Sequence, residues 1–348
     1  MAFPASVSPH PSPSALSDYV MSSAPYSVTE YADLQETALT LLHQYPPTSE
    51  EDATQRVLQA ALEHLPVDGR TTMMMEISLL GENWAQIRQL SQFFTDAVLK
   101  PMRLQRSPPS IPPSPSSDAA PGISTLMSLL ETSTRARQST LKAACLRRDG
   151  YRCALSNRIE SEAVLEGHVL QGDRQVCSTK CAHILPFGLR KIDEGDSLDM
   201  EREATIWWAL FRYFPSLHGI IAAETINQVE NTITLETDMH NHFDAFRITL
   251  EPSHACPNVY NIHNFTSISG LVPETATMRS QDPKVPLPRP EFFQVHFTVA
   301  SILDVTGLGA RMNAFLDPEF WEEAHGHAKA DGSTDLATLV ERKMLIGI

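Results

Sequence analysis

The sequence predicts an α+β protein that is predominantly helical. Apolar residues recur at helical spacing across residues 29–104, and again across 124–148 and 203–214. Short alternating patterns, which are typical of strands, occur at 232–235 and 246–250, and a short helix is expected between them. The 348 residues are enough for one large domain or two modest ones.

The composition is that of an acidic, folded, intracellular protein. Hydrophobic residues make up 42% of the chain, and the formal net charge is −15. This charge argues against a protein that coats nucleic acid over its whole surface, but it leaves room for a local basic patch. The five cysteines are scattered and odd in number, which favours a reducing compartment, either nucleus or cytoplasm, over a disulfide framework. We expect neither a secretory signal nor a membrane-spanning helix.

The first third of the chain divides into three segments. Residues 1–28 are rich in Pro and Ser and are expected to be disordered. Residues 29–104 carry apolar stripes at helical spacing and predict a small helical region. Residues 105–123 are again rich in Pro and Ser, so they predict an extended linker and a domain boundary.

A basic stretch follows the linker. A helix is expected at about 124–148, and its second half and the residues just after it contain most of the nearby arginines. Arg147, Arg148 and Arg152 are therefore candidates for nucleic-acid contacts, since Arg is suited to phosphate oxygens. The alternative, which the sequence leaves open, is a solvated helix face that balances an acidic protein.

Residues 240–244 place an imidazole and a carboxylate on one face of the short expected helix. His240 and Asp244 are four residues apart, so their side chains lie one above the other and can close on one divalent ion. Pairs with this spacing are also common on ordinary helix surfaces, so the spacing alone does not predict a metal site. His242 should point away from this face, as a surface or partly packed histidine.

Four segments occur in a defined order along the chain. They are Arg147-Arg-Asp-Gly-Tyr-Arg-Cys153, Ala182-His-Ile-Leu-Pro-Phe187, Asn231-Thr-Ile-Thr-Leu235 and His240-Asn-His-Phe-Asp244. This set resembles an HNH endonuclease domain, and more narrowly the fungal HNH-domain proteins in which a helical insertion separates the two halves of the motif. The resemblance covers about residues 138–255 and leads us to place a nuclease domain at 124–255. It implies a ββα-metal fold, in which two antiparallel strands and a helix hold one divalent ion.

The resemblance also implies a role for each matching residue. His183 would be the general base, because a neutral imidazole can take a proton from water near pH 7. Asn231 would brace the loop that carries this base. His240 and Asp244 would be the metal ligands, and an imidazole with a carboxylate suits Mg²⁺, Mn²⁺ or Zn²⁺.

Two positions depart from the family pattern and keep two functions open. Many HNH enzymes have Asp or His immediately before the base, where this chain has Ala182, and the usual Gly after the middle Asn is Thr232. One hypothesis is a metal-dependent endonuclease acting on DNA, with RNA left open as a substrate. The other is a degenerate, non-catalytic HNH fold that binds nucleic acid or protein. The oligomeric state is also open, although cleavage of both DNA strands needs two sites, which a homodimer would supply.

Residues 256–348 contain no motif with catalytic spacing, and we expect an α+β extension packed on the nuclease domain. Strands are expected at about 257–265 and 292–299, and helices at about 300–316 and 336–345. The aromatic helix at 203–214 is expected to form core rather than a surface that stacks on bases.

Overall fold

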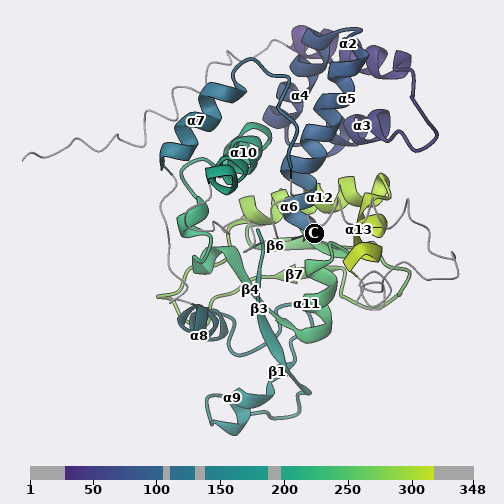
Figure 1. Cartoon of the computed structure of the whole chain (residues 1–348). Helices are drawn as coiled ribbons and strands as arrows, with labels where there is room; N and C mark the ends of the chain where they lie inside the picture. Colours follow the sequence, from purple (N-terminus) through teal and green to yellow (C-terminus); the bar gives the residue numbers. More distant parts are fainter. Residues whose placement is uncertain (1–27, 105–109, 130–137, 187–196, 317–348) are drawn as a thin grey trace, which may run out of the picture.

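The computed structural model describes residues 28–104, 110–129, 138–186 and 197–316 (Figure 1). Two expected features lie outside these ranges, namely nearly all of the disordered N-terminal segment and the final helix at 336–345. Helices dominate the described part, and the strands form three small sheets, in agreement with the expected α+β class. None of the described helices has the length and apolar character needed to cross a membrane.

The residues before position 105 form a helical layer, which occupies the upper part of Figure 1. Its helices are α2 (Val28–Gln44), α3 (Thr54–His64), α4 (Val67–Leu80) and α5 (Trp84–Phe94), and a π-helical turn (Thr95–Leu99) leads into α6 (Lys100–Leu104). Helix α4 was not expected, because its apolar residues form a run of methionines and not a helical stripe. Met73 and Met74 of this run are fully buried, which makes them part of the core.

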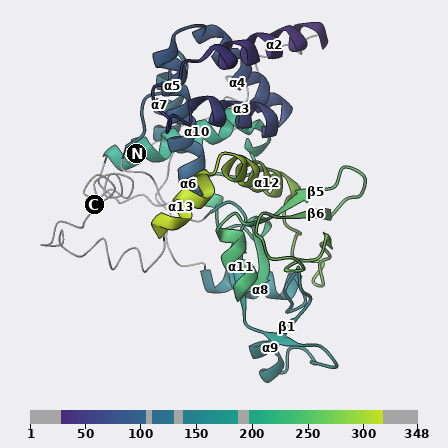
Figure 2. The same ribbon diagram turned by 90° about the vertical axis from the view of Figure 1, so that its right-hand side faces the viewer.

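The expected linker is not an extended spacer throughout, because helix α7 (Ala119–Leu129) begins inside it. Helix α7 packs against α10 (Ser197–Tyr213), beside the helical layer (Figures 1 and 2). The carboxylate of Glu76 in α4 accepts hydrogen bonds from Ser116 Oγ and from Arg212 Nε, the latter at 2.6 Å. The segment before α7 is therefore anchored to the helical layer. The division of the chain into domains stays a prediction.

An antiparallel hairpin lies at the centre of the lower part of the molecule. Strand β3 (Thr179–His183) pairs with β4 (Thr232–Glu236), and helix α10 lies between the two strands in the sequence. Helix α11 (Thr237–Asp244) follows β4 directly and contacts both strands. Helix α8 (Gln138–Arg148) also packs on both strands, on the other side of the hairpin from α11 (Figure 1). Two antiparallel strands, a helical insertion and a following helix thus occur in the expected order.

Two further sheets flank the hairpin. A three-stranded antiparallel sheet contains β5 (Ile248–Pro252), β6 (Val259–Asn264) and β7 (Thr275–Thr277). A short parallel pair, β1 (Ile159–Glu160) and β2 (Val176–Cys177), carries helix α9 (Ser161–Leu165) at the lower end of Figure 1. The strand expected from position 246 begins only at Ile248, because Phe246 has a φ of 56° in the turn after α11.

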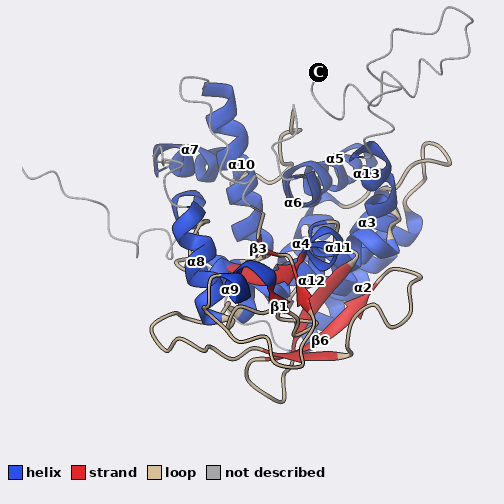
Figure 3. Cartoon of the chain, turned by 90° about the horizontal axis from the view of Figure 1, so that it is seen from below, coloured by secondary structure: helices blue, strands red, loops and turns tan. Residues whose placement is uncertain are grey.

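The strand expected at 292–299 is wrong, because residues 290–305 form helix α12 (Pro290–Val305). This helix begins at Pro290, a residue well suited to a first helical turn. It is buried on most of its circumference between β5 and α3, so its sequence lacks the amphipathic stripe of a surface helix. Helix α13 (Leu308–Leu316) then closes the described part, and Figure 3 shows how the helices surround the short strands.

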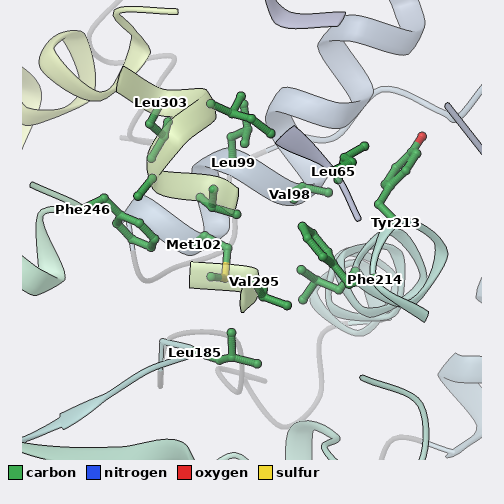
Figure 4. Close-up of a cluster of buried hydrophobic side chains, with 14 of the residues drawn as sticks. Leu65, Val98, Leu99, Met102, Leu185, Tyr213, Phe214, Phe246, Val295 and Leu303 are labelled. Atoms are coloured by element: carbon green, nitrogen blue, oxygen red, sulfur yellow. The ribbon is translucent and has the colours of Figure 1, made fainter. Parts of the chain in front are cut away.

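One cluster of buried apolar side chains joins the helical layer to the hairpin. Figure 4 shows part of it, where Leu185 lies in the same cluster as Met102 of α6 and Val295 of α12. Leu185 is fully buried and follows the end of β3 by two residues. The helical layer and α12 therefore fix the backbone that leaves the candidate base, His183. The aromatic helix α10 is core as expected, since Trp207 and Tyr213 are buried.

Candidate active site

His183 is the last residue of β3, where it pairs with Thr232 of β4. Its Nε2 atom lies 3.0 Å from Oδ1 of Asn227. Burial lowers the pKa of His183, and the nearby His240 acts in the same direction, while the bond to Asn227 and the charge of Asp244 oppose the shift. The lowered pKa favours the neutral form of His183, which is the form that a proton acceptor needs.

Asn231 immediately precedes β4, and its side chain is fully buried. Its Oδ1 accepts a hydrogen bond from the backbone N–H of Leu185 at 2.8 Å, and its Nδ2 donates to the carbonyl of Leu185 at 2.9 Å. Nδ2 also donates to the carbonyl of Ile226 at 3.0 Å. These are the contacts that a brace for the loop after His183 requires.

Helix α11 places His240 and Asp244 one above the other. Nδ1 of His240 lies 3.4 Å from a carboxylate oxygen of Asp244. This nitrogen is buried and makes no hydrogen bond within the described part of the chain. Burial lowers the pKa of His240, and the charge of Asp244 opposes the shift. A buried imidazole nitrogen that faces a carboxylate is a donor set that fits one hard divalent ion.

Among the residues that the structure describes, this neighbourhood adds no third protein ligand. Ala182 is fully buried opposite Ile233 of β4, and it has no ligand atom where many HNH enzymes have one. Across the described residues, no three or more His, Cys, Asp or Glu side chains are grouped so that they could hold a metal. An ion held by His240 and Asp244 would take its remaining ligands from water and substrate.

One of the three expected nucleic-acid contacts is contradicted by the structure. Arg148 is fully buried, and its guanidinium pairs with both carboxylate oxygens of Asp149, at 2.7 and 2.8 Å. It also donates to the carbonyl of Val229 at 2.8 Å. Because the side chain is buried in these internal contacts, it has no access to a phosphate. Arg148 instead joins helix α8 to the 3₁₀ turn (Val229–Asn231) that precedes β4.

Arg147 and Arg152 stay candidates. Arg147 is about half exposed, with a long contact of 3.4 Å to Asp282. Arg152 is partly buried, and its Nε atom has no hydrogen-bond partner in the described chain. Burial lowers the pKa of Arg152, and the positive charge of Arg174 adds to the shift. Two guanidinium groups that repel one another are a favourable setting for an anion such as a phosphate.

The other face of α11 borders an open groove of about 680 Å³. Its lining includes Asp238 and His242 of α11 together with Arg158, but none of His183, His240 and Asp244. His242 is therefore directed away from the pair of candidate ligands, as expected. The groove is separate from the expected chemistry.

Two residues near the site were missed by sequence reasoning. Asn227 lies in an irregular turn, and no spacing rule singles it out. Arg103 of α6 is buried near Asp244, whose charge opposes the lowering of the Arg103 pKa that burial causes. Arg103 is far from Asp244 in the sequence, so only the tertiary structure could reveal that the two residues are close.

The comparisons with known proteins bear on the same region. Residues 153–251 match a family model described as HNH endonuclease. The match covers less than a third of the chain and includes β3, β4 and α11. No curated protein and no solved structure matches the chain.

Proposed function

We propose that this protein is a metal-dependent endonuclease that hydrolyses phosphodiester bonds in DNA, because residues 153–251 match a family model described as HNH endonuclease. One observation carries the proposal. Helix α11 packs against β3, the strand that ends at His183, and it carries His240 and Asp244 with 3.4 Å between the imidazole nitrogen and the carboxylate. A histidine base beside a partly buried pair of metal-ligand type is the arrangement that phosphodiester hydrolysis needs.

Each residue has a defined role in this proposal. His183 takes a proton from the attacking water, and Asn231 holds the loop behind it. His240 and Asp244 would hold one divalent ion, Mg²⁺, Mn²⁺ or Zn²⁺, which supplies stabilisation of the charge that develops on the phosphate and the leaving oxygen. Arg147 and Arg152 contact the phosphates of the DNA backbone.

The experiment that tests this proposal is nicking of supercoiled plasmid by the full chain with Mg²⁺ or Mn²⁺. For the His183→Ala variant we expect the nicking rate to fall by about 10²- to 10⁴-fold, which is the usual contribution of a general base. His218→Ala is a matched control, since His218 is another partly buried histidine and stacks on Phe211. Unchanged nicking by a folded His183→Ala protein would refute the assignment.

A second candidate function is a non-catalytic HNH fold that binds nucleic acid or protein. It is favoured by the fully buried Ala182, which leaves the site with two protein ligands. Calorimetric titration with Mg²⁺, Mn²⁺ and Zn²⁺ separates the two functions. The endonuclease proposal expects binding that is weakened by His240→Ala or Asp244→Ala, but not by His242→Ala on the same helix. Absence of binding at millimolar metal, together with absence of nicking, would favour the interaction module.

A further inference from the structure

The ring of His183 meets a side-chain oxygen that the HNH motif residues do not include. Nε2 of His183 lies 3.0 Å from Oδ1 of Asn227. An amide oxygen can only accept a hydrogen bond, so the ring nitrogen must donate and must carry the proton. In the neutral imidazole the other nitrogen, Nδ1, then has no proton and is the atom able to take one from water.

The turn that carries Asn227 is built firmly enough to hold this oxygen in place. It lies between two short 3₁₀ helices, Ala223–Thr225 and Val229–Asn231. The backbone N–H of Gln228 donates to the carbonyl of Thr225 at 2.9 Å, and the Gln228 side chain donates to the carbonyl of Ile220 at 2.9 Å. A backbone hydrogen bond and a side-chain hydrogen bond thus both hold the turn in place.

Asn231 connects this turn to the strand that carries His183. Its amide nitrogen bonds the carbonyl of Ile226, the residue before Asn227, and also the carbonyl of Leu185. Its own carbonyl accepts from the N–H of Ile184, the residue after His183, at 2.9 Å. One buried residue therefore sets the backbone of His183 and the backbone of Asn227 at a fixed separation.

We propose that Asn227 is a positioning residue that fixes His183 in the tautomer with the proton on Nε2, leaving Nδ1 as the proton acceptor. The inference rests on the proposed function for its catalytic meaning, but the tautomer itself is independent of turnover. A ring held in this way keeps Nδ1 in one orientation. Less conformational entropy is then lost when Nδ1 and the attacking water come into position.

The test begins with ¹⁵N nuclear magnetic resonance of the imidazole nitrogens of His183 in the full chain. We expect a protonated, pyrrole-type signal for Nε2 and an unprotonated, pyridine-type signal for Nδ1 in the wild-type protein. Asn227→Ala should give a mixture of tautomers, whereas Asn227→Asp, which keeps an acceptor oxygen, should retain the wild-type pattern. The opposite tautomer in the wild type, or no change in Asn227→Ala, would overturn the inference.

Nicking rates at saturating DNA form the second arm. For Asn227→Ala we expect the maximal rate to fall about 10- to 100-fold with little change in KM, which is the usual size for loss of a group that orients a catalytic side chain. Asn227→Asp, which keeps an acceptor oxygen for Nε2, should recover most of the rate. Asn261→Ala, at an exposed position of β6 away from this turn, is the control, with rate and tautomer expected to be unchanged.

The two arms separate the two hypotheses. A tautomer that changes in Asn227→Ala with no loss of rate, or a loss of rate without a change of tautomer, would each refute the positioning role. If the wild-type protein does not nick DNA at all, the endonuclease proposal fails, and the resonance arm alone decides whether Asn227 sets the tautomer.

Discussion

The side chain of Asn231 and the backbone of Leu185 exchange two hydrogen bonds, one in each direction, at 2.8 and 2.9 Å. The amide thereby adds two hydrogen bonds just beyond the last residue pair of β3 and β4, where the chain leaves β3. Since Leu185 is part of the core that joins the hairpin to the helical layer, this exchange fixes the position of His183 from the inside of the molecule.

Replacement of Asn231 by Ala is expected to destabilise the protein as well as slow the reaction. It leaves the N–H and carbonyl of Leu185 and the carbonyl of Ile226 buried without this partner, and each such group costs about 1–3 kcal/mol. We expect the free energy of unfolding, measured in urea, to fall by roughly 2–5 kcal/mol. Asn261→Ala, at an exposed position of β6, is the control. Equal stability of the two variants would contradict the bracing role.

Arg147 and Arg148 are adjacent in sequence, but we expect their replacement to affect different properties, stability for Arg148 and DNA binding for Arg147. Arg148→Ala leaves the buried carboxylate of Asp149 without its partner, so the free energy of unfolding should fall by about 3–5 kcal/mol. Arg147→Ala should change stability by less than about 1 kcal/mol, because its pair with Asp282 is half exposed. Arg147→Ala should instead weaken DNA binding and lower its dependence on salt.

Denaturant unfolding and DNA binding at several salt concentrations measure these two effects. The proposed phosphate contact of Arg147 would be refuted if its loss left the affinity for DNA and its salt dependence unchanged. The structural role of Arg148 would be refuted by a folded Arg148→Ala protein as stable as the wild type.

His296 makes the stability of the fold depend on pH. It stacks between Phe243 and Phe246, at centroid distances of 4.0 and 4.3 Å, and its Nδ1 lies 2.8 Å from Thr249 Oγ1. Burial lowers the pKa of His296 to about 3, from an ordinary value of 6.5. Between these values the unfolded chain binds a proton that the folded chain does not. The stabilisation is therefore complete above about pH 6.5 and is lost as the pH falls.

We expect the free energy of unfolding to decrease by about 1.4 kcal/mol per pH unit from His296 alone as the pH falls below about 6. Burial lowers the pKa of His64 and His218 too, so their contributions have the same sign. Urea unfolding at several pH values between about 4 and 7 measures the slope. His296→Gln, which cannot titrate, should give a shallower slope, and an identical slope would contradict this account.

The sequence patterns that predicted structure correctly depend only on interactions between residues that are close in the sequence. The separation of His240 and Asp244 by four residues placed them together on α11, and the alternation in 232–235 identified β4. Asn231 was expected to brace the loop after His183, and its hydrogen bonds are of that kind. The catalytic and metal-binding roles of these residues stay predictions.

The features that sequence reasoning missed depend on distant packing. Arg148 lies in a basic stretch with Arg147 and Arg152, and nothing local distinguishes an arginine that faces solvent from one that closes on Asp149 in the core. Helix α12 has apolar residues on all sides because β5 and α3 enclose it, so its pattern was mistaken for a strand. Asn227 contacts the candidate base only because the chain, at the end of the long insertion between β3 and β4, comes back to His183.

The last prediction concerns Ala182, the position at which many HNH enzymes supply a metal ligand. Ala182 lies on the strand that ends at His183, and it is fully buried beside Ile233. Without metal, Ala182→Asp buries a carboxylate and should lower the free energy of unfolding by roughly 2–4 kcal/mol. With Mg²⁺ or Mn²⁺ present, much of this loss should be restored, since binding to the folded state alone stabilises it. Ala182→Asn has nearly the same size without the charge, so it should be restored less. Equal destabilisation of Ala182→Asp with and without metal, in denaturant titrations, would mean that residue 182 does not face the ion held by His240 and Asp244.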